Sequence, residues 1–295
     1  MKTIQQIVDS YCAGLSLLLV ETTERARLLR IVRDVIRKLE QRFFERHGTE
    51  KMTVPYLLVE WDQETGFLST VQLRNITGEL TVCDAFKADG LSQLLSSMLS
   101  ASGPAGMFAK FDDPILALSA ITRLQEACSL QHEAIIVLMH NMHPHFDNAN
   151  LLNVMLDNRV TTMRWSSEAT RRLVICYQPT SGGAVHKDIK HLFTPIQLPL
   201  PSADDLLICV ENCCLDETGA PLFNIDSSLQ RELADRLCGL TEPVAENVMA
   251  LTITAHRQHI DRSAELTPAT RERILAEVDR KKADMVQSSR ALKYI

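Results

Sequence analysis

The residues with the clearest potential for chemistry lie where a short apolar run meets a long helix-forming stretch, near the start of the chain. The junction reads Val20-Glu21-Thr22-Thr23-Glu24-Arg25. A phosphate-binding loop at such a junction needs glycines, so that backbone amides can approach the phosphates, and a lysine followed by serine or threonine. This junction has neither glycine nor lysine, and the carboxylates of Glu21 and Glu24 stand where phosphates would lie. Its position indicates a nucleotide-binding fold, whereas its residue types argue against a bound nucleotide.

A second stretch where a nucleotide hydrolase needs specific residues is the end of a later apolar strand, predicted over Ala134–Met139. Such enzymes place a carboxylate there to hold magnesium and orient water. Here the strand is followed by His140-Asn141-Met142-His143, and the turn at residues 239–243 has no arginine that could reach a nucleotide. Since all three elements are missing, we predict an inactive domain with no catalytic residue. Its degenerate site would lie near Glu21, Thr22, Thr23, Glu24, Asn141 and His143.

One alternative is a metal site after the same strand, because imidazoles and a carboxylate at short spacing can bind zinc. The candidate ligands are His140, His143, His145 and Asp147. Pro144 interrupts any helical register among them, and the sequence shows no second group of ligands. We therefore favour polar loop residues and predict no metal. Cys213-Cys214 is interpreted as neighbouring core and surface residues, and Asp112-Asp113 as a helix cap.

The elements that must position these residues are five apolar runs of strand length separated by helices. The runs occupy residues 15–20, 55–62, 134–139, 172–177 and 195–200. A hairpin is predicted after the second run. The helix after the first run carries eight Lys and Arg from Arg25 to Arg46, against Asp34, Glu40 and Glu45. We interpret this excess as a solvated face, and next as a subunit contact; contact with a nucleic-acid backbone is a weaker alternative.

The order of these elements predicts two domains. Strands alternating with helices favour an α/β core over residues 1–200, with a parallel sheet flanked by helices. From Pro201 onward the pattern is helical, with capped helix starts at Asp226 and Thr267. The predicted fold is therefore a degenerate P-loop-NTPase-like sheet of the AAA or RecA kind, followed by a small helical lid over residues 201–295.

Composition excludes several classes of protein. The 295 residues are 45% hydrophobic and 23% charged, with a net charge of −6, which is typical of a globular protein and argues against a dedicated nucleic-acid binder. The eight cysteines form no C-x-x-C pair, which favours reduced thiols inside a cell. No apolar run approaches 18 residues and no signal peptide opens the chain, so the sequence predicts a cytoplasmic location without membrane contact.

Seven short motifs follow one another in a recognisable order. They are LLLVETTERAR at 17–27, the Trp61-Asp62 strand end with Gly66, DDPILAL at 112–118, VLMHNMH at 137–143, QLPLPSADDL at 197–206, GLTEPVAENV at 239–248 and KKADMVQSSRAL at 281–292. In this order the chain resembles the N-terminal region of AAA-type ATPases related to an uncharacterised plastid-encoded reading frame, with bacterial and phage members. Asn141 replaces an aspartate of the family pattern.

The resemblance implies a function for this region. It would be a pseudo-ATPase module with its own lid, acting in oligomer assembly or in binding a substrate or partner. A complete AAA module would follow residue 295, and ATP and magnesium would belong to that module, with no cofactor for this chain. The partners implied are further copies or an AAA module. The alternative is a stand-alone interaction or adaptor protein of AAA-like fold, possibly phage-encoded.

Overall fold

The computed structural model divides the chain into two compact units, residues 1–198 and residues 199–295. It describes residues 2–47, 56–64, 66–76, 79–86, 112–127, 134–164, 172–179, 191–215, 218–219, 221–222, 225–256 and 266–291. The helices that the sequence predicts around Leu91–Leu99 and over residues 186–193 lie wholly or partly outside these ranges.

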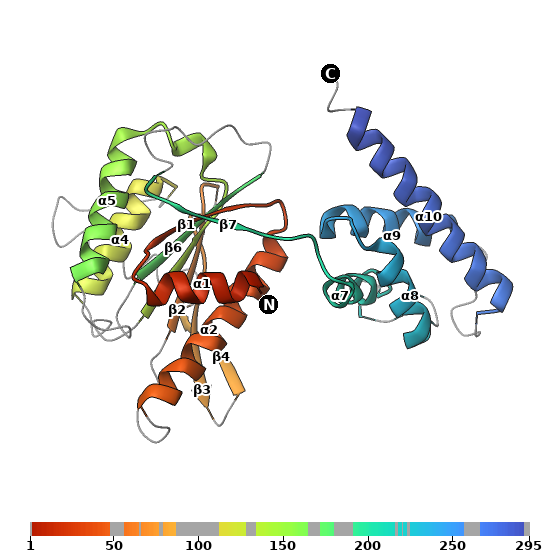
Figure 1. Cartoon of the computed structure of the whole chain (residues 1–295), viewed down its shortest axis with the longest axis horizontal. Helices are drawn as coiled ribbons and strands as arrows, with labels where there is room; N and C mark the ends of the chain where they lie inside the picture. The colour runs from red at the N-terminus through yellow and green to blue at the C-terminus, as the bar shows by residue number, and fades with distance from the viewer. Residues whose placement is uncertain are drawn as a thin grey trace. The chain divides into compact units, whose positions relative to one another are not determined.

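The first unit is built on a seven-stranded sheet with the order β4-β3-β2-β5-β6-β1-β7 (Figure 1). Its strands are β1 Leu17–Glu21, β2 Tyr56–Asp62, β3 Gly66–Ile76, β4 Glu79–Phe86, β5 Ala134–Met139, β6 Arg172–Gln178 and β7 Thr194–Gln197. The five predicted strands form a parallel sheet. The predicted hairpin is β2–β3, and β4, which the sequence did not predict, extends it antiparallel at the edge.

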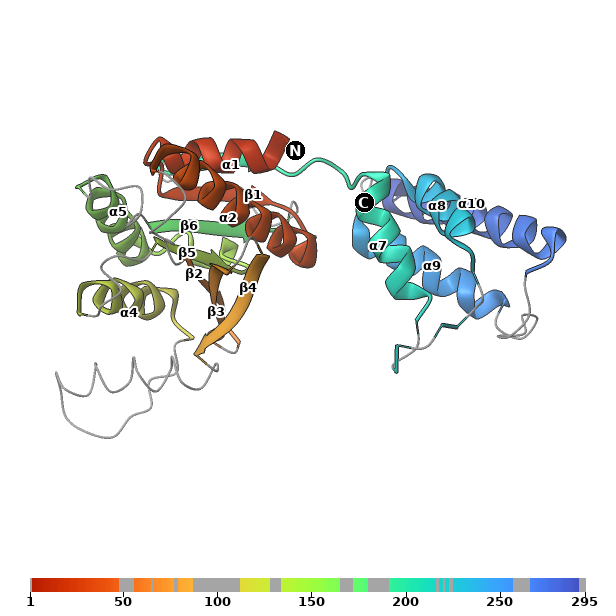
Figure 2. The same ribbon diagram turned by 90° about the horizontal axis from the view of Figure 1, so that it is seen from below.

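Helices cover both faces of the parallel strands. Side chains that alternate along each strand pack on one face against α1 (Lys2–Cys12) and α2 (Arg25–His47), and on the other against α4 (Pro114–Ala127) and α5 (Ala149–Arg164). Figure 2 shows α1 and α2 together on one side of the strands and α4 on the other. Strands buried on both faces read as continuous apolar runs, which is why the sequence revealed them. The predicted α/β fold is confirmed.

The strand order fixes where a ligand site would form. From β1 the chain moves to β2, returns through β5 and β6, and then places β7 on the other side of β1. In open parallel sheets, ligands bind outside the carboxyl ends of the strands where the order reverses. The carboxyl ends of β1, β2, β5 and β6 therefore define the edge to inspect.

The second unit is helical in the described residues and has its own apolar core. Its helices are α7 Ala203–Cys213, α8 Ser227–Leu237, α9 Glu242–His256 and α10 Pro268–Ala291. Asp226 caps α8 as predicted, accepting a hydrogen bond from the backbone nitrogen of Leu229 at 2.6 Å. Ser202 and Asp205 form a capping box at α7. Across the described ranges, no helix combines the length and apolar character needed to cross a membrane.

Candidate functional site

The junction between β1 and α2 is three residues long, since the strand ends at Glu21 and the helix begins at Arg25. Thr22 holds it in place: its backbone nitrogen donates to Gln178 at 2.8 Å, and its hydroxyl accepts from the backbone nitrogen of Glu24 at 3.0 Å. A phosphate-cradling nest needs backbone in alternating right- and left-handed conformations. Among the described non-glycine residues only Asn141 has a positive φ, so this junction forms no such nest.

A buried ion pair occupies the start of α2. Glu24 accepts a hydrogen bond from Arg27 at 2.8 Å, and the two side chains are only 4% and 5% exposed. The N-terminus of a helix carries partial positive charge, which favours an anion there. In this chain the anion is the protein's own carboxylate. Of the other predicted residues here, Thr22 is buried, whereas Glu21 and Thr23 are exposed.

A second group of charged side chains joins α2 to the ends of β2 and β5. Arg25 donates to Glu60 Oε1 from Nε at 3.2 Å and from Nη2 at 2.8 Å, and its Nη1 lies 3.9 Å from Asp62. His140 Nε2 lies 2.8 Å from the same Glu60 oxygen. The ring of Tyr177 meets the His140 ring edge-on at 4.7 Å between centroids. We call these five residues the Glu60 cluster.

The electrostatics of the Glu60 cluster keep its carboxylate ionised. Burial raises the pKa of Glu60, but the close contacts of His140 and Arg25 outweigh burial and lower it to about 2. Burial raises the pKa of Tyr177 to about 12, so its phenol stays neutral. A carboxylate with so low a pKa is a poor general base near neutral pH. The cluster is therefore suited to anchoring α2 on the sheet, not to activating water.

The polar residues after β5 lie at the same edge of the sheet. Asn141 is exposed, with a φ of 50°, and His143 is exposed in the short turn of residues 143–145. His145 Nε2 lies 3.2 Å from the side-chain oxygen of Gln63. Burial lowers the pKa of His145, with nearby Asp113 opposing the change. Within the described ranges, no three His, Cys, Asp or Glu side chains gather as metal ligands would.

The structure also describes the Asp112-Asp113 and Cys213-Cys214 pairs. Asp113 accepts a hydrogen bond from the backbone nitrogen of Ile115 at 2.8 Å, which makes it the predicted helix cap. Cys214 is buried and Cys213 is half-buried, and burial raises the pKa of the Cys214 thiol to about 12. That value leaves the Cys214 thiol protonated and unreactive near neutral pH.

Sequence reasoning missed Arg25, Glu60, Asp62 and Tyr177 as members of the site. One signal was available: Glu60 is a charged residue inside the apolar run of β2, and a charge buried in a strand requires a partner. The partners themselves lie 35 and 80 positions along the chain, at Arg25 and His140, and only the strand order brings them to Glu60.

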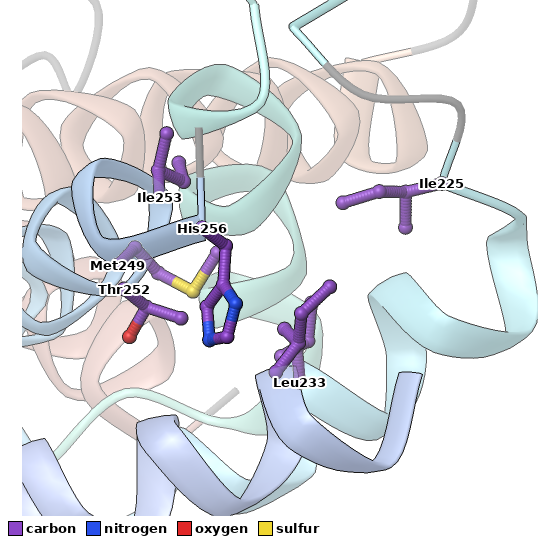
Figure 3. Close-up of a pocket in the computed structure, with 7 residues that line it drawn as sticks. Ile225, Leu233, Met249, Thr252, Ile253 and His256 are labelled. Carbon is purple, nitrogen blue, oxygen red and sulfur yellow. The ribbon is translucent and has the colours of Figure 1, made fainter. Parts of the chain in front are cut away.

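A small apolar pocket lies in the second unit (Figure 3). It opens between α8, α9 and α10, and the imidazole of His256 projects into it beside Met249 and Thr252. Its cavity volume of about 10 Å³ is far below the usual range of ligand pockets, about 300 to 1,000 Å³. It is therefore smaller than a nucleotide site would be.

No protein-family model and no curated protein matches the sequence. Solved structures similar to the chain include C. elegans PCH-2, with a TM-score of 0.47 and 11% identity over 96% of this chain and 69% of that chain. The Aeropyrum pernix ORC2 protein, solved as ADPNP-ADP complexes, has a TM-score of 0.46 and 11% identity, over 93% of this chain and 66% of that chain. The Aeropyrum pernix ORC1 protein, in complex with DNA, has a TM-score of 0.41 and 11% identity, over 97% of this chain and 66% of that chain.

These structural neighbours are AAA+ ATPases, at low identity. The chain spans about two thirds of the length of each of the three. A shared fold does not fix a function, which depends on the residues of the site. The function proposed next rests on the residues of this chain.

Proposed function

We propose that this chain is a non-catalytic P-loop-like module that acts by assembling with further copies of itself or with an AAA-type ATPase module. The observation that carries the proposal is the buried Glu24–Arg27 pair at the start of α2. The pair places a buried carboxylate with its own counter-charge at the helix start, which is where a nucleotide phosphate would bind in a P-loop protein.

The electrostatic cost of a phosphate at this position supports the proposal. Two unit charges of like sign 4 Å apart repel by about 4 kcal/mol at an effective dielectric constant near 20. Glu24 is held in place by Arg27, and the carboxylates of Glu60 and Asp62 stand at the same edge of the sheet. The junction has no glycine and no lysine to bind a phosphate, and its arginines, Arg25 and Arg27, already pair with Glu60 and Glu24.

The residues present do not fit magnesium either. A metal at the end of β5 would need a free carboxylate, and the chain has His140-Asn141 there. The nearest carboxylate to His140 is Glu60, whose Oε1 is already engaged by both Arg25 and His140. Bound ATP and magnesium are therefore assigned to a partner module and not to this chain.

The test measures nucleotide binding and turnover on one preparation of the whole chain. Calorimetric titration with Mg·ATP and with ADP, followed by a phosphate-release assay, is expected to show neither binding nor hydrolysis. Glu24→Ala, which removes the fixed anion, and Glu21→Ala, its exposed control, go through the same assays. Saturable binding of ATP by the unaltered chain would overturn the proposal, and turnover that survives both substitutions would place the site elsewhere.

A further inference from the structure

A stripe of arginines runs along the side of α2 that faces away from the sheet. The buried residues of the helix, Leu28, Val32, Val35, Ile36 and Leu39, define the face that packs on the strands. Arg30, Arg33 and Arg37 follow at spacings of three and four residues on the opposite side. The Arg37 side chain is 61% exposed, whereas Arg30 and Arg33 are half-buried. We call these three residues the basic stripe.

The second unit carries a stripe of opposite charge along α7. Leu206, Cys209 and Val210 are its buried positions. On the other side lie Asp204, Ile208 and Glu211, which are all exposed, the Asp204 side chain at 79% and Ile208 at 41%. We call these three residues the acidic stripe. Ile208 therefore lies between two carboxylates on this exposed side of the helix.

The two stripes match in spacing. Arg30 and Arg37 are seven residues apart, as are Asp204 and Glu211. At 1.5 Å of rise per residue each pair spans about 10 Å, so two helices lying side by side could align both arginines with both carboxylates.

The distribution of charge favours a second copy of the chain as the partner. Residues 199–295 contain 16 Asp and Glu against 11 Lys and Arg, and so supply most of the net charge of −6. Each copy therefore presents a basic stripe on one unit and an acidic surface on the other. Surfaces of opposite charge steer two molecules together and fix their register.

We propose that the basic stripe of one copy docks on the acidic stripe of another. This inference rests on the proposed assembly function and names its contact surfaces. Such a contact is heterologous, so every copy can engage two neighbours, one through each stripe. The ion pairs that these residues make within the chain include Arg37–Asp34 at 2.6 Å and Asp204–Arg231 at 2.8 Å. Both pairs are exposed, and exposed pairs contribute little, so they can exchange partners at small cost.

The experiment measures self-association of the full chain by sedimentation velocity, at low salt and at moderate salt. We expect the unaltered chain to associate and to dissociate as salt rises, because exposed charges are screened. Arg30→Glu with Arg37→Glu, and separately Asp204→Arg with Glu211→Arg, should each weaken association by about tenfold or more, since like charges then face each other across the contact. Combining all four substitutions in one chain should restore it.

Matched controls reverse exposed charges outside both stripes. Arg273→Glu on α10 makes the net charge more negative, as the basic-stripe substitutions do, and Asp235→Arg on α8 makes it more positive, as the acidic-stripe substitutions do. Both controls should leave association unchanged. Circular dichroism of every variant checks that the helices are intact.

Three results of the sedimentation experiment would overturn the inference. They are a chain that stays monomeric at low salt, association that the stripe variants leave unchanged, and association that the combined variant does not restore. Binding of duplex DNA by the basic stripe without self-association would also overturn it and assign the stripe to nucleic acid. The nucleotide titrations decide the proposed function separately, because none of these substitutions touches Glu24 or Glu60.

Discussion

At the scale of single residues, the most consequential contact is the pair between Glu24 and Arg27, because both charges are almost fully removed from water. Replacing one member leaves the other buried without its main counter-charge, which typically costs 3 to 5 kcal/mol. We expect Glu24→Ala to lower the free energy of unfolding by about this amount, measured by urea denaturation. Glu21→Ala, at the exposed neighbouring position, should change it by less than about 0.5 kcal/mol. Equal effects of the two substitutions would contradict this account.

The Glu60 cluster predicts how stability depends on pH. The folded-state pKa of Glu60 is about 2, below its ordinary value of 4.5, so its ionised form stabilises the fold above about pH 4.5. That contribution is lost as the pH falls from 4.5 through 2. Because Arg25 is 45% exposed and partly screened, we expect a contribution on the order of 2 kcal/mol. The free energies of unfolding of the unaltered chain and of Glu60→Gln should differ most near neutral pH and converge in acid.

A difference between the two proteins that stays constant from pH 7 to pH 2 would contradict this assignment. Asp62→Asn is the matched control, because Asp62 lies at 3.9 Å from Arg25 and is not the carboxylate that His140 contacts. Its effect on stability should be smaller, and its pH dependence weaker, than that of Glu60→Gln.

The sequence could predict which residues lie at the strand ends, but not which of their side chains contact one another. Sequence reasoning grouped Glu24 with Asn141 and His143 at a common edge because parallel strands end together. It could not show that the Glu24 side chain points inward to Arg27, or that His140, and not Asn141, contacts Glu60. Such pairings depend on which face of the strand a side chain occupies, and a shift of one residue reverses that choice.

At the scale of elements, burial on both faces decided what the sequence could reveal. The strand β5 (Ala134–Met139) coincides with its prediction because residues 135–139 pack alternately against the helix layers on the two faces of the sheet. In contrast β4 (Glu79–Phe86), an edge strand, was missed because its residues are a mixture of polar and apolar types.

The start of α8 offers a prediction for a single helix. Asp226 accepts a hydrogen bond from the backbone nitrogen of Leu229 and satisfies one free amide of the first turn. We expect Asp226→Ala to destabilise the second unit by about 1 kcal/mol, measured by thermal unfolding. Asp226→Asn keeps an acceptor at the cap and should recover most of the loss. If both substitutions cost the same, the effect would belong to the exposed ion pair with Arg271 and not to the cap.

At the scale of the whole molecule, the two units have separate apolar cores. In the part of the chain that the structure describes, the two clusters on the faces of the sheet contain only residues of the first unit, and the cluster around α7 to α10 contains only residues of the second. Each unit therefore has the means to fold as a cooperative block of its own.

Separate cores predict separate responses to substitution. Leu233, on α8, and Leu118, on α4, are both fully buried, and Leu→Ala at such sites typically costs 2 to 5 kcal/mol. In the full chain, Leu233→Ala should speed hydrogen exchange in residues 225–291 and leave β5 and β6 protected, whereas Leu118→Ala should do the reverse. Mass spectrometry of exchanged peptides resolves the two regions. If either substitution deprotected both regions equally, the chain would unfold as one cooperative unit and the two cores could not be treated as independent.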